Sequence, residues 1–196
     1  MKKFIFIMSA LAAGLTLSAC GGGKSSDTAQ DSTAVADTTD SKVLVAYYSA
    51  TGTTAKAAAE VADATGGTLY EIVPEKVYTD EDLDYENDNS RSAIENKNPD
   101  MRPAIKTGLD TAPYETVYVG FPVWWDKAPL VVYTFLDSYD FTGKKIIVFA
   151  TAHSSGLNPS FDALKAAYPN YNLTEGVILN KTSEKAFDEW LDSLKK

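Results

Sequence analysis

Five short strand-like segments alternate with helical segments along most of the sequence. Three of them are apolar almost throughout, as is typical of strands covered on both faces, and they span residues 43–49, 115–123 and 144–152. Two others, at 68–73 and 172–179, carry the acidic residues Glu71 and Glu175. We therefore expect the apolar strands in the middle of a sheet and the polar strands at its edges.

Helical patterns separate these strands. An alanine-rich helix stopped by glycine is expected over 54–67, and further helices are expected over 128–139, 158–168 and 182–196. Alternation of strands and helices predicts an α/β fold, with a parallel sheet between two layers of helices. Right-handed crossovers and polar edge strands together favour the strand order 2-1-3-4-5 in this three-layer sandwich.

The first residues have a different character. Lys2 and Lys3 precede an apolar run over 4–17 that is too short to span a bilayer, so residues 1–19 are interpreted as a signal peptide for export. Residues 17–20 resemble the lipobox of bacterial lipoproteins, which implies that Cys20 is lipidated and that the protein is anchored to a membrane at the cell envelope. The alternative is plain secretion, with Cys20 lost in a discarded signal peptide.

Residues 20–41 predict a disordered tether, because they are rich in Gly, Ser, Thr and Asp and contain no aromatic residue. The folded domain is expected at 42–196. Since Cys20 is the only cysteine, this domain has no disulfide and no thiol chemistry. The formal charge of −9 becomes −11 once the two signal lysines are removed, which argues against nucleic-acid binding.

The loop at 49–54 (SATGTT) leads from the first strand into its helix. Hydroxyl side chains, a glycine and the free N–H groups of a helix start are suited to binding an anion such as a phosphate monoester. No G-x-G-x-x-G or P-loop lysine is present. The other interpretation is a polar turn that only caps the helix.

Two tryptophans follow the third strand, in the stretch FPVWWDKAP at 121–129. We expect Pro122 to bend the chain as it leaves the strand, so that Trp124 and Trp125 lie on a loop beside the anion site. One indole could then cover a flat ligand while the other packs on the scaffold. Alternatively, both are core or partner-contact residues. The loop at 151–157 follows the fourth strand, and its small residues would let backbone groups approach a ring edge.

These loops and the final helix resemble the flavodoxin family, especially a bacterial branch with a proline and paired tryptophans in the second loop. The resemblance covers residues 42–196 and implies non-covalent binding of FMN in a flavodoxin-like fold. The site residues that it implies are Ser49, Thr51, Gly52, Thr53, Thr54, Tyr85, Pro122, Val123, Trp124, Trp125, Thr151, Ala152, His153, Ser154, Ser155 and Gly156.

The sequence departs from this branch at three places. Thr53 replaces a common Asn, Asp126 stands where Gly is common, and the run AHSS at 152–155 replaces a glycine-rich run. A residue with a β-carbon does not reach positive φ freely. We therefore expect the backbone change that accompanies flavin reduction in the family to be hindered here, whereas FMN binding itself is less affected.

The connection at 78–105 is longer than usual, strongly acidic, and contains both arginines. It resembles an insertion of this branch in which a tyrosine such as Tyr85 borders the cofactor, although most of its acids are expected on a solvated surface. His153 could donate to a reduced flavin, or it could be an exposed histidine without a role. A single histidine without thiols is a poor metal ligand set, so no metal site is expected.

The resemblance implies an electron-transfer flavoprotein with a redox partner protein or a small quinone-type acceptor. An NAD(P)H-dependent quinone or flavin reductase is one alternative. A lipoprotein that retains the fold but has lost redox chemistry is another. No Ser-His-Asp set or spaced carboxylate pair supports hydrolysis.

Overall fold

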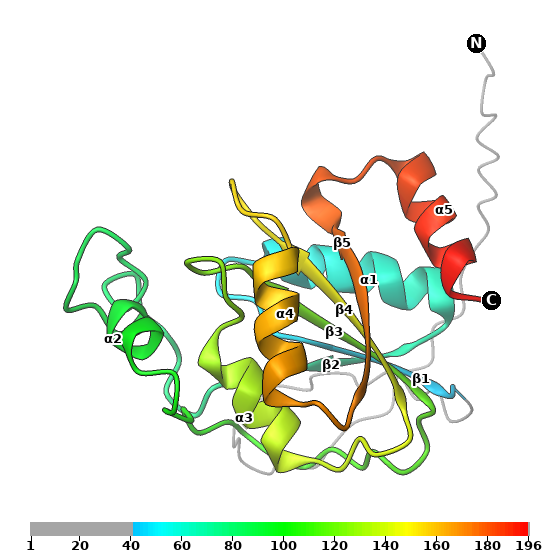
Figure 1. Cartoon of the computed structure of the whole chain (residues 1–196), viewed down its shortest axis with the longest axis horizontal. Coiled ribbons are helices and arrows are strands. Elements are labelled where there is room, and N and C mark those ends of the chain that lie inside the picture. Colours follow the sequence, from blue (N-terminus) through cyan, green and yellow to red (C-terminus); the bar gives the residue numbers. More distant parts are fainter. Residues whose placement is uncertain (1–40, 196) are drawn as a thin grey trace, which may run out of the picture. The chain divides into compact units, whose positions relative to one another are not determined.

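The computed structural model describes residues 41–195. The predicted signal peptide, Cys20 and almost all of the predicted tether lie outside these residues, so those predictions stay untested. The described part forms one parallel sheet with helices on both faces (Figure 1). None of its helices is long and apolar enough to cross a membrane.

The sheet has five strands in the order β2-β1-β3-β4-β5, and every neighbouring pair is parallel. This confirms the predicted order, with the polar strands at the edges. The strands are β1 (Val43–Tyr47), β2 (Thr68–Glu71), β3 (Thr116–Pro122), β4 (Lys145–Thr151) and β5 (Asn172–Ile178).

Four helices complete the outer layers, and their bounds lie within about two residues of the predicted ones. The left-handed Gly66, with φ of 63°, ends the first of them as predicted. A fifth helix, α2, lies in the acidic connection and was not predicted. The helices are α1 (Thr53–Thr65), α2 (Arg91–Lys97), α3 (Leu130–Ser138), α4 (Asn158–Ala167) and α5 (Glu184–Leu194), with a 3₁₀ turn η1 (Leu179–Lys181).

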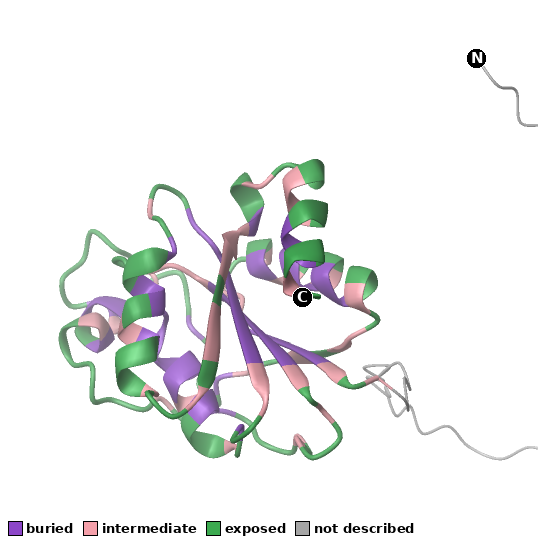
Figure 2. Cartoon of the chain, turned by 45° about the vertical axis from the view of Figure 1, so that its right-hand side comes forward, coloured by how far each residue is buried: buried purple, intermediate pink, exposed green. Residues whose placement is uncertain are grey.

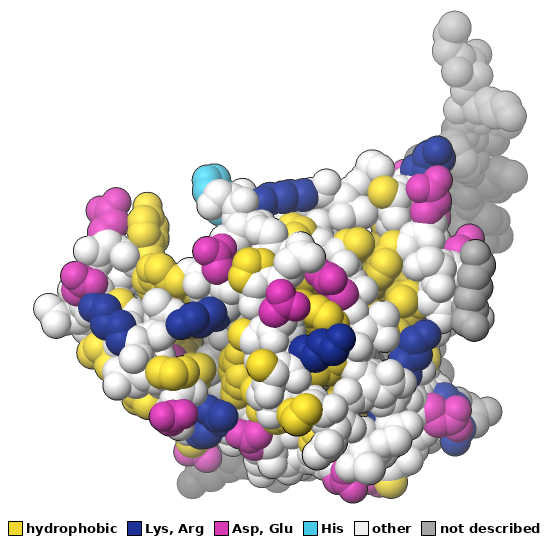
Figure 3. All heavy atoms as spheres, in the orientation of Figure 1, with side chains coloured by type: hydrophobic (Ala, Val, Ile, Leu, Met, Phe, Trp, Pro, Cys, Tyr) yellow, Lys and Arg dark blue, Asp and Glu magenta, His cyan; other side chains and the backbone are white. Residues whose placement is uncertain are grey.

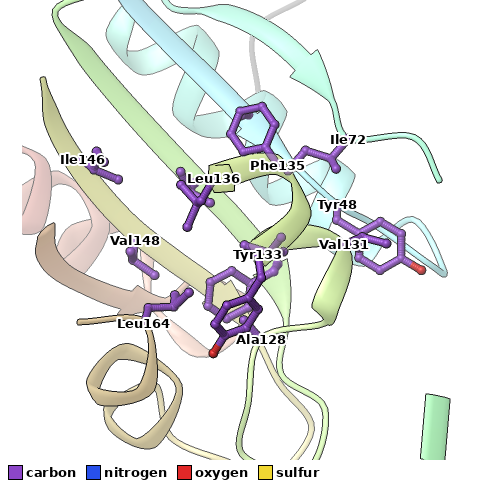
Figure 4. Close-up of a cluster of buried hydrophobic side chains, with 14 of the residues drawn as sticks. Tyr48, Ile72, Ala128, Val131, Tyr133, Phe135, Leu136, Ile146, Val148 and Leu164 are labelled. Atoms are coloured by element: carbon purple, nitrogen blue, oxygen red, sulfur yellow. The ribbon is translucent and has the colours of Figure 1, made fainter. Parts of the chain in front are cut away.

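Two hydrophobic clusters fill the space between the layers. On one face, α3 and α4 pack on the sheet, and Figure 4 shows Leu136 and Leu164 of these helices near Ile146 and Val148 of β4. On the other face, α1 and α5 supply small and aromatic side chains, including Trp190. The middle strands are therefore buried on both sides (Figure 2).

The chain runs in opposite directions from β1 and from β3. The strand that follows β1 in sequence, β2, lies on one side of this central pair, and the strand that follows β3, β4, lies on the other side. The carboxyl ends of these two strands define the topological switch point of a doubly wound sheet, where ligands bind in such folds. The three loops singled out in the sequence follow β1, β3 and β4 and thus lie at this edge.

Candidate functional site

The first loop has the backbone that an anion site requires. Gly52 has φ of 86°, in the left-handed region that favours glycine, and its N–H donates to Ser49 Oγ at 3.1 Å. No side chain caps the start of α1, and no acidic residue lies in its first turn. The hydroxyl-bearing residues Thr51 and Thr53 are exposed, so this helix start presents donors to a ligand.

Thr54 has a different role from its neighbours. Its side chain is buried, and its Oγ1 lies 2.7 Å from Thr151 Oγ1 at the end of β4. The hydroxyl predicted to line the anion site therefore joins the first loop to the third. This buried hydrogen bond connects the loop after β1 with the end of β4, so it fixes the distance between the first and third loops.

The second loop contains a tight turn, and its position corrects the sequence interpretation. Pro122 is still paired with Thr151 in the sheet, and the chain reverses three residues later, at Trp125 and Asp126. Two hydrogen bonds of 2.9 Å join the backbones of Trp124 and Lys127. The last residue of β3 that pairs with β1 is Gly120. Pro122 lies beyond it, so the N–H that proline lacks costs no hydrogen bond between β3 and β1.

Both central residues of this turn have positive φ, 46° for Trp125 and 61° for Asp126. Such angles are those of a type I′ turn, which normally contains Asn or Gly. Asp126 therefore adopts a positive φ despite its β-carbon. The expected hindrance to a backbone change on flavin reduction stays a prediction. By contrast, no residue of the third loop has positive φ, so the AHSS run imposes no such strain there.

The two tryptophans separate as predicted, one on the scaffold and one toward solvent. Trp124 contacts Tyr48 and Tyr78 edge to face, with ring centroids 5.7 and 5.4 Å apart. The side chain of Trp125 is 39% exposed. Trp124 therefore anchors the turn, and Trp125 is the indole that remains accessible.

A buried polar network supports Trp124. Tyr78 donates to Glu95 Oε2 at 2.6 Å, and Arg91 Nε donates to Glu95 Oε1 at 2.7 Å while its guanidinium lies over the Tyr78 ring. Burial, followed by the bond to Glu95, raises the pKa of Tyr78 well above its usual value. Both carboxylate oxygens of this nearly buried glutamate are thus satisfied.

The third loop is held by a residue that sequence reasoning did not single out. The Asn180 side chain accepts from Ala152 N–H at 2.9 Å and donates to Ala152 C=O at 3.0 Å. The Asn180 amide thereby satisfies the backbone N–H and C=O of Ala152, as a neighbouring strand would. Val123 N–H also donates to Thr151 C=O at 2.8 Å, which joins the second loop to the third. Asn180 stands just after β5, and nothing in its sequence context distinguishes it.

The remaining predicted residues are solvent-facing. His153, Ser154 and Gly156 are exposed, and Ser155 is half-buried. The chain's one histidine projects from the surface in Figure 3. Tyr85 is 74% exposed on the acidic connection, and among residues 41–195 its side chain has no ring contact or hydrogen bond with the three loops. The described residues contain no cluster of metal-ligating side chains.

A doubly wound sheet with an uncapped helix start and an exposed indole at its switch point defines an α/β protein suited to a phosphorylated, flat cofactor. The chain belongs to the flavodoxin family, whose sequence profile matches residues 42–194. No curated protein sequence matches the chain.

Solved structures agree with this family. The chain is 46% identical to a protein from Bacteroides eggerthii DSM 20697, provisionally named a flavoprotein, with a TM-score of 0.76 and coverage of 79% of this chain and 98% of the other. A second such protein, from Bacteroides uniformis ATCC 8492, is also 46% identical, with a TM-score of 0.74 and coverage of 77% and 97%. Nearly the whole of each of these solved chains corresponds to this domain.

A more distant structure shares the fold. A flavoprotein from Lactobacillus acidophilus NCFM, solved in complex with FMN, is 20% identical, with a TM-score of 0.63 and coverage of 76% of this chain and 98% of that protein.

Proposed function

We propose that residues 42–196 bind FMN non-covalently and transfer electrons through it, and that lipid on Cys20 anchors the protein to a membrane at the cell envelope. The observation on which this rests is the uncapped start of α1, where a left-handed Gly52 and exposed Thr51 and Thr53 surround free backbone N–H groups. This donor set fits a phosphate without a lysine.

The other loops fit the flat part of the cofactor. Trp125 presents an exposed indole against which a ring can lie, and Asn180 holds the backbone of the third loop so that it can contact the ring edge. Bound FMN supplies one-electron and two-electron chemistry. The net negative formal charge of the chain disfavours additional negative charge on the cofactor and thus lowers the reduction potential.

The arginines favour an electron carrier over an NADPH-dependent reductase. Arg91 is paired with the buried Glu95, and Arg102 is paired with Asp137, at 2.7 and 2.5 Å. Since the described residues contain no other arginine, no guanidinium is free to bind the 2′-phosphate of NADPH. A redox partner protein or a small quinone-type molecule is then the acceptor.

The test of the cofactor site is Thr53→Asp, which places a carboxylate at the first residue of α1. A negative charge at this position suits the helix dipole, so the fold is retained. Repulsion of the phosphate should lower the affinity for FMN by at least about tenfold, or roughly 1.4 kcal/mol, and leave the affinity for riboflavin unchanged. Visible absorbance and fluorescence titrations of residues 42–196 measure both.

The control is Ala64→Asp, which adds the same charge to the last turn of α1, about 16 Å along the helix axis. This variant should bind FMN as the unmodified domain does. If Thr53→Asp binds FMN normally, the phosphate does not lie at the start of α1. A further assay measures NAD(P)H consumption by the FMN-loaded domain, with and without a quinone. A reductase consumes NAD(P)H, whereas we expect this domain, as a carrier, to consume none.

The anchor is tested in the full chain. Cys20→Ala should move the protein from the membrane fraction to the soluble fraction of the cell envelope, because the acyl chains have no other attachment site. Retention of the variant in the membrane fraction would contradict lipidation at Cys20.

A further inference from the structure

A cavity lies at the amino ends of the central strands, at the opposite edge of the sheet from the three loops. Its walls come from the first residues of β1, β3 and β4 and from the last turns of α1 and α5, which pack on the same face of the sheet (Figure 1). Its volume is about 270 Å³. Because β4 alone spans about 20 Å, this cavity is separate from the proposed FMN site.

The apolar part of the wall is entirely aliphatic. It comprises Val43, Ala64, Ile147, Leu191 and Leu194. A volume of about 270 Å³ is close to the lower end of the range for ligand pockets, and a cavity of about 150 Å³ already accommodates benzene. The size and the walls therefore fit a short aliphatic chain.

Tyr118 brings a hydroxyl group without a protein partner to this cavity. The residue is only 5% exposed, and its hydroxyl makes no hydrogen bond among residues 41–195. In that part of the chain, the polar side-chain atoms that are fully enclosed without a partner are Asn96 Oδ1 and Trp190 Nε1, so the Tyr118 oxygen retains surface on the cavity wall. Burial raises the pKa of Tyr118, so the hydroxyl stays protonated. An acceptor on a ligand removes the cost of this unpaired donor.

Lys145 supplies a positive charge beside this hydroxyl. Tyr118 pairs with Ile147 in the sheet, and Lys145 lies two residues before Ile147 on the same face. Long side chains at such diagonal positions are within reach of each other. Lys145 Nζ donates to Leu194 C=O at 2.6 Å, which offsets the negative end of the α5 dipole. It has no ion-pair partner within residues 41–195, so its remaining N–H groups can donate to a ligand.

The other charges around the cavity do not oppose an anion. Lys195 also lines it and is bound to Asp192 at 2.8 Å, and no carboxylate from the described part of the chain lies in the wall. Glu115, just before β3, is 76% exposed and is paired with Lys42 at 3.8 Å.

Two threonines complete the polar wall. Thr65 Oγ1 donates to Val61 C=O at 2.6 Å, whereas Thr116 Oγ1 makes no hydrogen bond among the described residues. A hydroxyl group can donate as well as accept, so Thr116 is compatible with an anionic ligand. The polar wall therefore presents donors and positive charge next to aliphatic side chains.

We propose that this cavity binds a monocarboxylate with a short aliphatic chain, of the medium-chain fatty acid class. The carboxylate accepts from the Tyr118 hydroxyl and from Lys145 Nζ, and the chain lies against Leu191 and Leu194. The two oxygens of a carboxylate match this pair of donors. Binding does not depend on FMN, because none of the residues of the three loops lines the cavity.

The test uses residues 42–196, which contain both hydrophobic clusters, in calorimetric titrations without FMN. The probes are octanoate and 1-octanol, which have the same chain length and differ in charge. Octanoate should bind more tightly by at least about tenfold, because only the carboxylate pairs with the lysine charge. Saturating FMN should leave the affinity for octanoate unchanged.

Lys145→Met should remove this preference, since it keeps most of the apolar stem without the charge. Lys144→Met is the matched control and should retain the preference. Lys144 is also half-buried and also donates to a backbone C=O at 2.6 Å, but it does not line the cavity. Tyr118→Phe keeps the ring and should weaken octanoate binding by roughly fivefold, the equivalent of one hydrogen bond.

Ala64→Asp provides a further variant if Lys145→Met does not fold, because Ala64 is exposed in the last turn of α1. Its added carboxylate should weaken octanoate by about threefold and leave 1-octanol unchanged. Thr53→Asp should affect neither probe. The proposal is overturned if octanoate does not bind, if both probes bind equally, if Lys145→Met keeps the preference, or if Ala64→Asp leaves octanoate binding unchanged. Each of these outcomes is independent of whether FMN itself binds.

Discussion

At the scale of single residues, the turn at Trp125 and Asp126 is the feature in which sequence preference and structure disagree most. Two residues with β-carbons occupy positive φ, where a type I′ turn normally has Asn-Gly. Because Trp-Asp is not a typical pair for this turn, the sequence indicated a bend at Pro122 and gave no sign of the reversal that follows. The buried contacts of Trp124 with Tyr48 and Tyr78 hold the turn in place.

Substitution of Asp126 by glycine should therefore stabilise the domain. Removal of the left-handed penalty outweighs the added freedom of the unfolded chain, so we expect Asp126→Gly to raise the free energy of unfolding by about 0.5–1 kcal/mol. Asp126→Asn, which tolerates the same φ, should change it little. Urea denaturation measures both, and an unchanged or lower midpoint for Asp126→Gly would show that the turn is not strained.

At the scale of elements, the sheet was predictable and the acidic connection was not. The apolar content of each segment was enough to separate the central strands from the edge strands. A strand buried on both faces must be apolar along its whole length, whereas an edge strand need not be. Helix α2 escaped prediction because it is short and polar, without an apolar stripe, and its residues Arg91 and Glu95 are stabilised by tertiary contacts with Tyr78. Likewise, the contact of Asn180 with Ala152 joins residues 28 positions apart.

The hydrogen bonds between Asn180 of η1 and Ala152 of the third loop predict how much the domain's stability depends on this contact. Asn180→Leu leaves the N–H and C=O of the buried Ala152 without partners, so it should lower the free energy of unfolding by about 2–4 kcal/mol. Lys181→Ala removes only an exposed 3.3 Å bond to Ser155 and should cost less than about 0.5 kcal/mol. Thermal and urea denaturation compare the two, and equal effects would mean that Asn180 does not hold the loop.

At the scale of the whole molecule, buried tyrosines make stability depend on alkaline pH. Burial raises the pKa of Tyr48, Tyr78 and Tyr168, with hydrogen bonds to carboxylates adding to the effect in the last two. An unfolded tyrosine ionises near pH 10, at about its ordinary pKa, so the unfolded state loses these protons first. The contribution is therefore fully present below about pH 10 and is lost as the pH rises further.

We expect the free energy of unfolding to vary little through these tyrosines between pH 7 and 9 and to fall steeply above about pH 10. Tyr78→Phe should reduce the alkaline slope by about 1.4 kcal/mol per pH unit, the effect of one proton. It should also destabilise the domain at neutral pH by about 1–3 kcal/mol, because Glu95 loses a buried donor. Urea denaturation across this pH range tests both effects, and parallel curves for the two proteins would contradict the tyrosine assignment.

The fold and the placement of the three loops at one edge of the sheet were thus accessible from hydrophobic pattern and loop order, whereas the contacts that hold the loops were not. The central functional claim is that the start of α1 binds the phosphate of FMN. Its most direct test is a titration of residues 42–196 with FMN and with riboflavin, which differ only in that phosphate. We predict stoichiometric binding of FMN with at least about tenfold higher affinity than riboflavin. Equal affinities, or no affinity for either flavin, would contradict the claim.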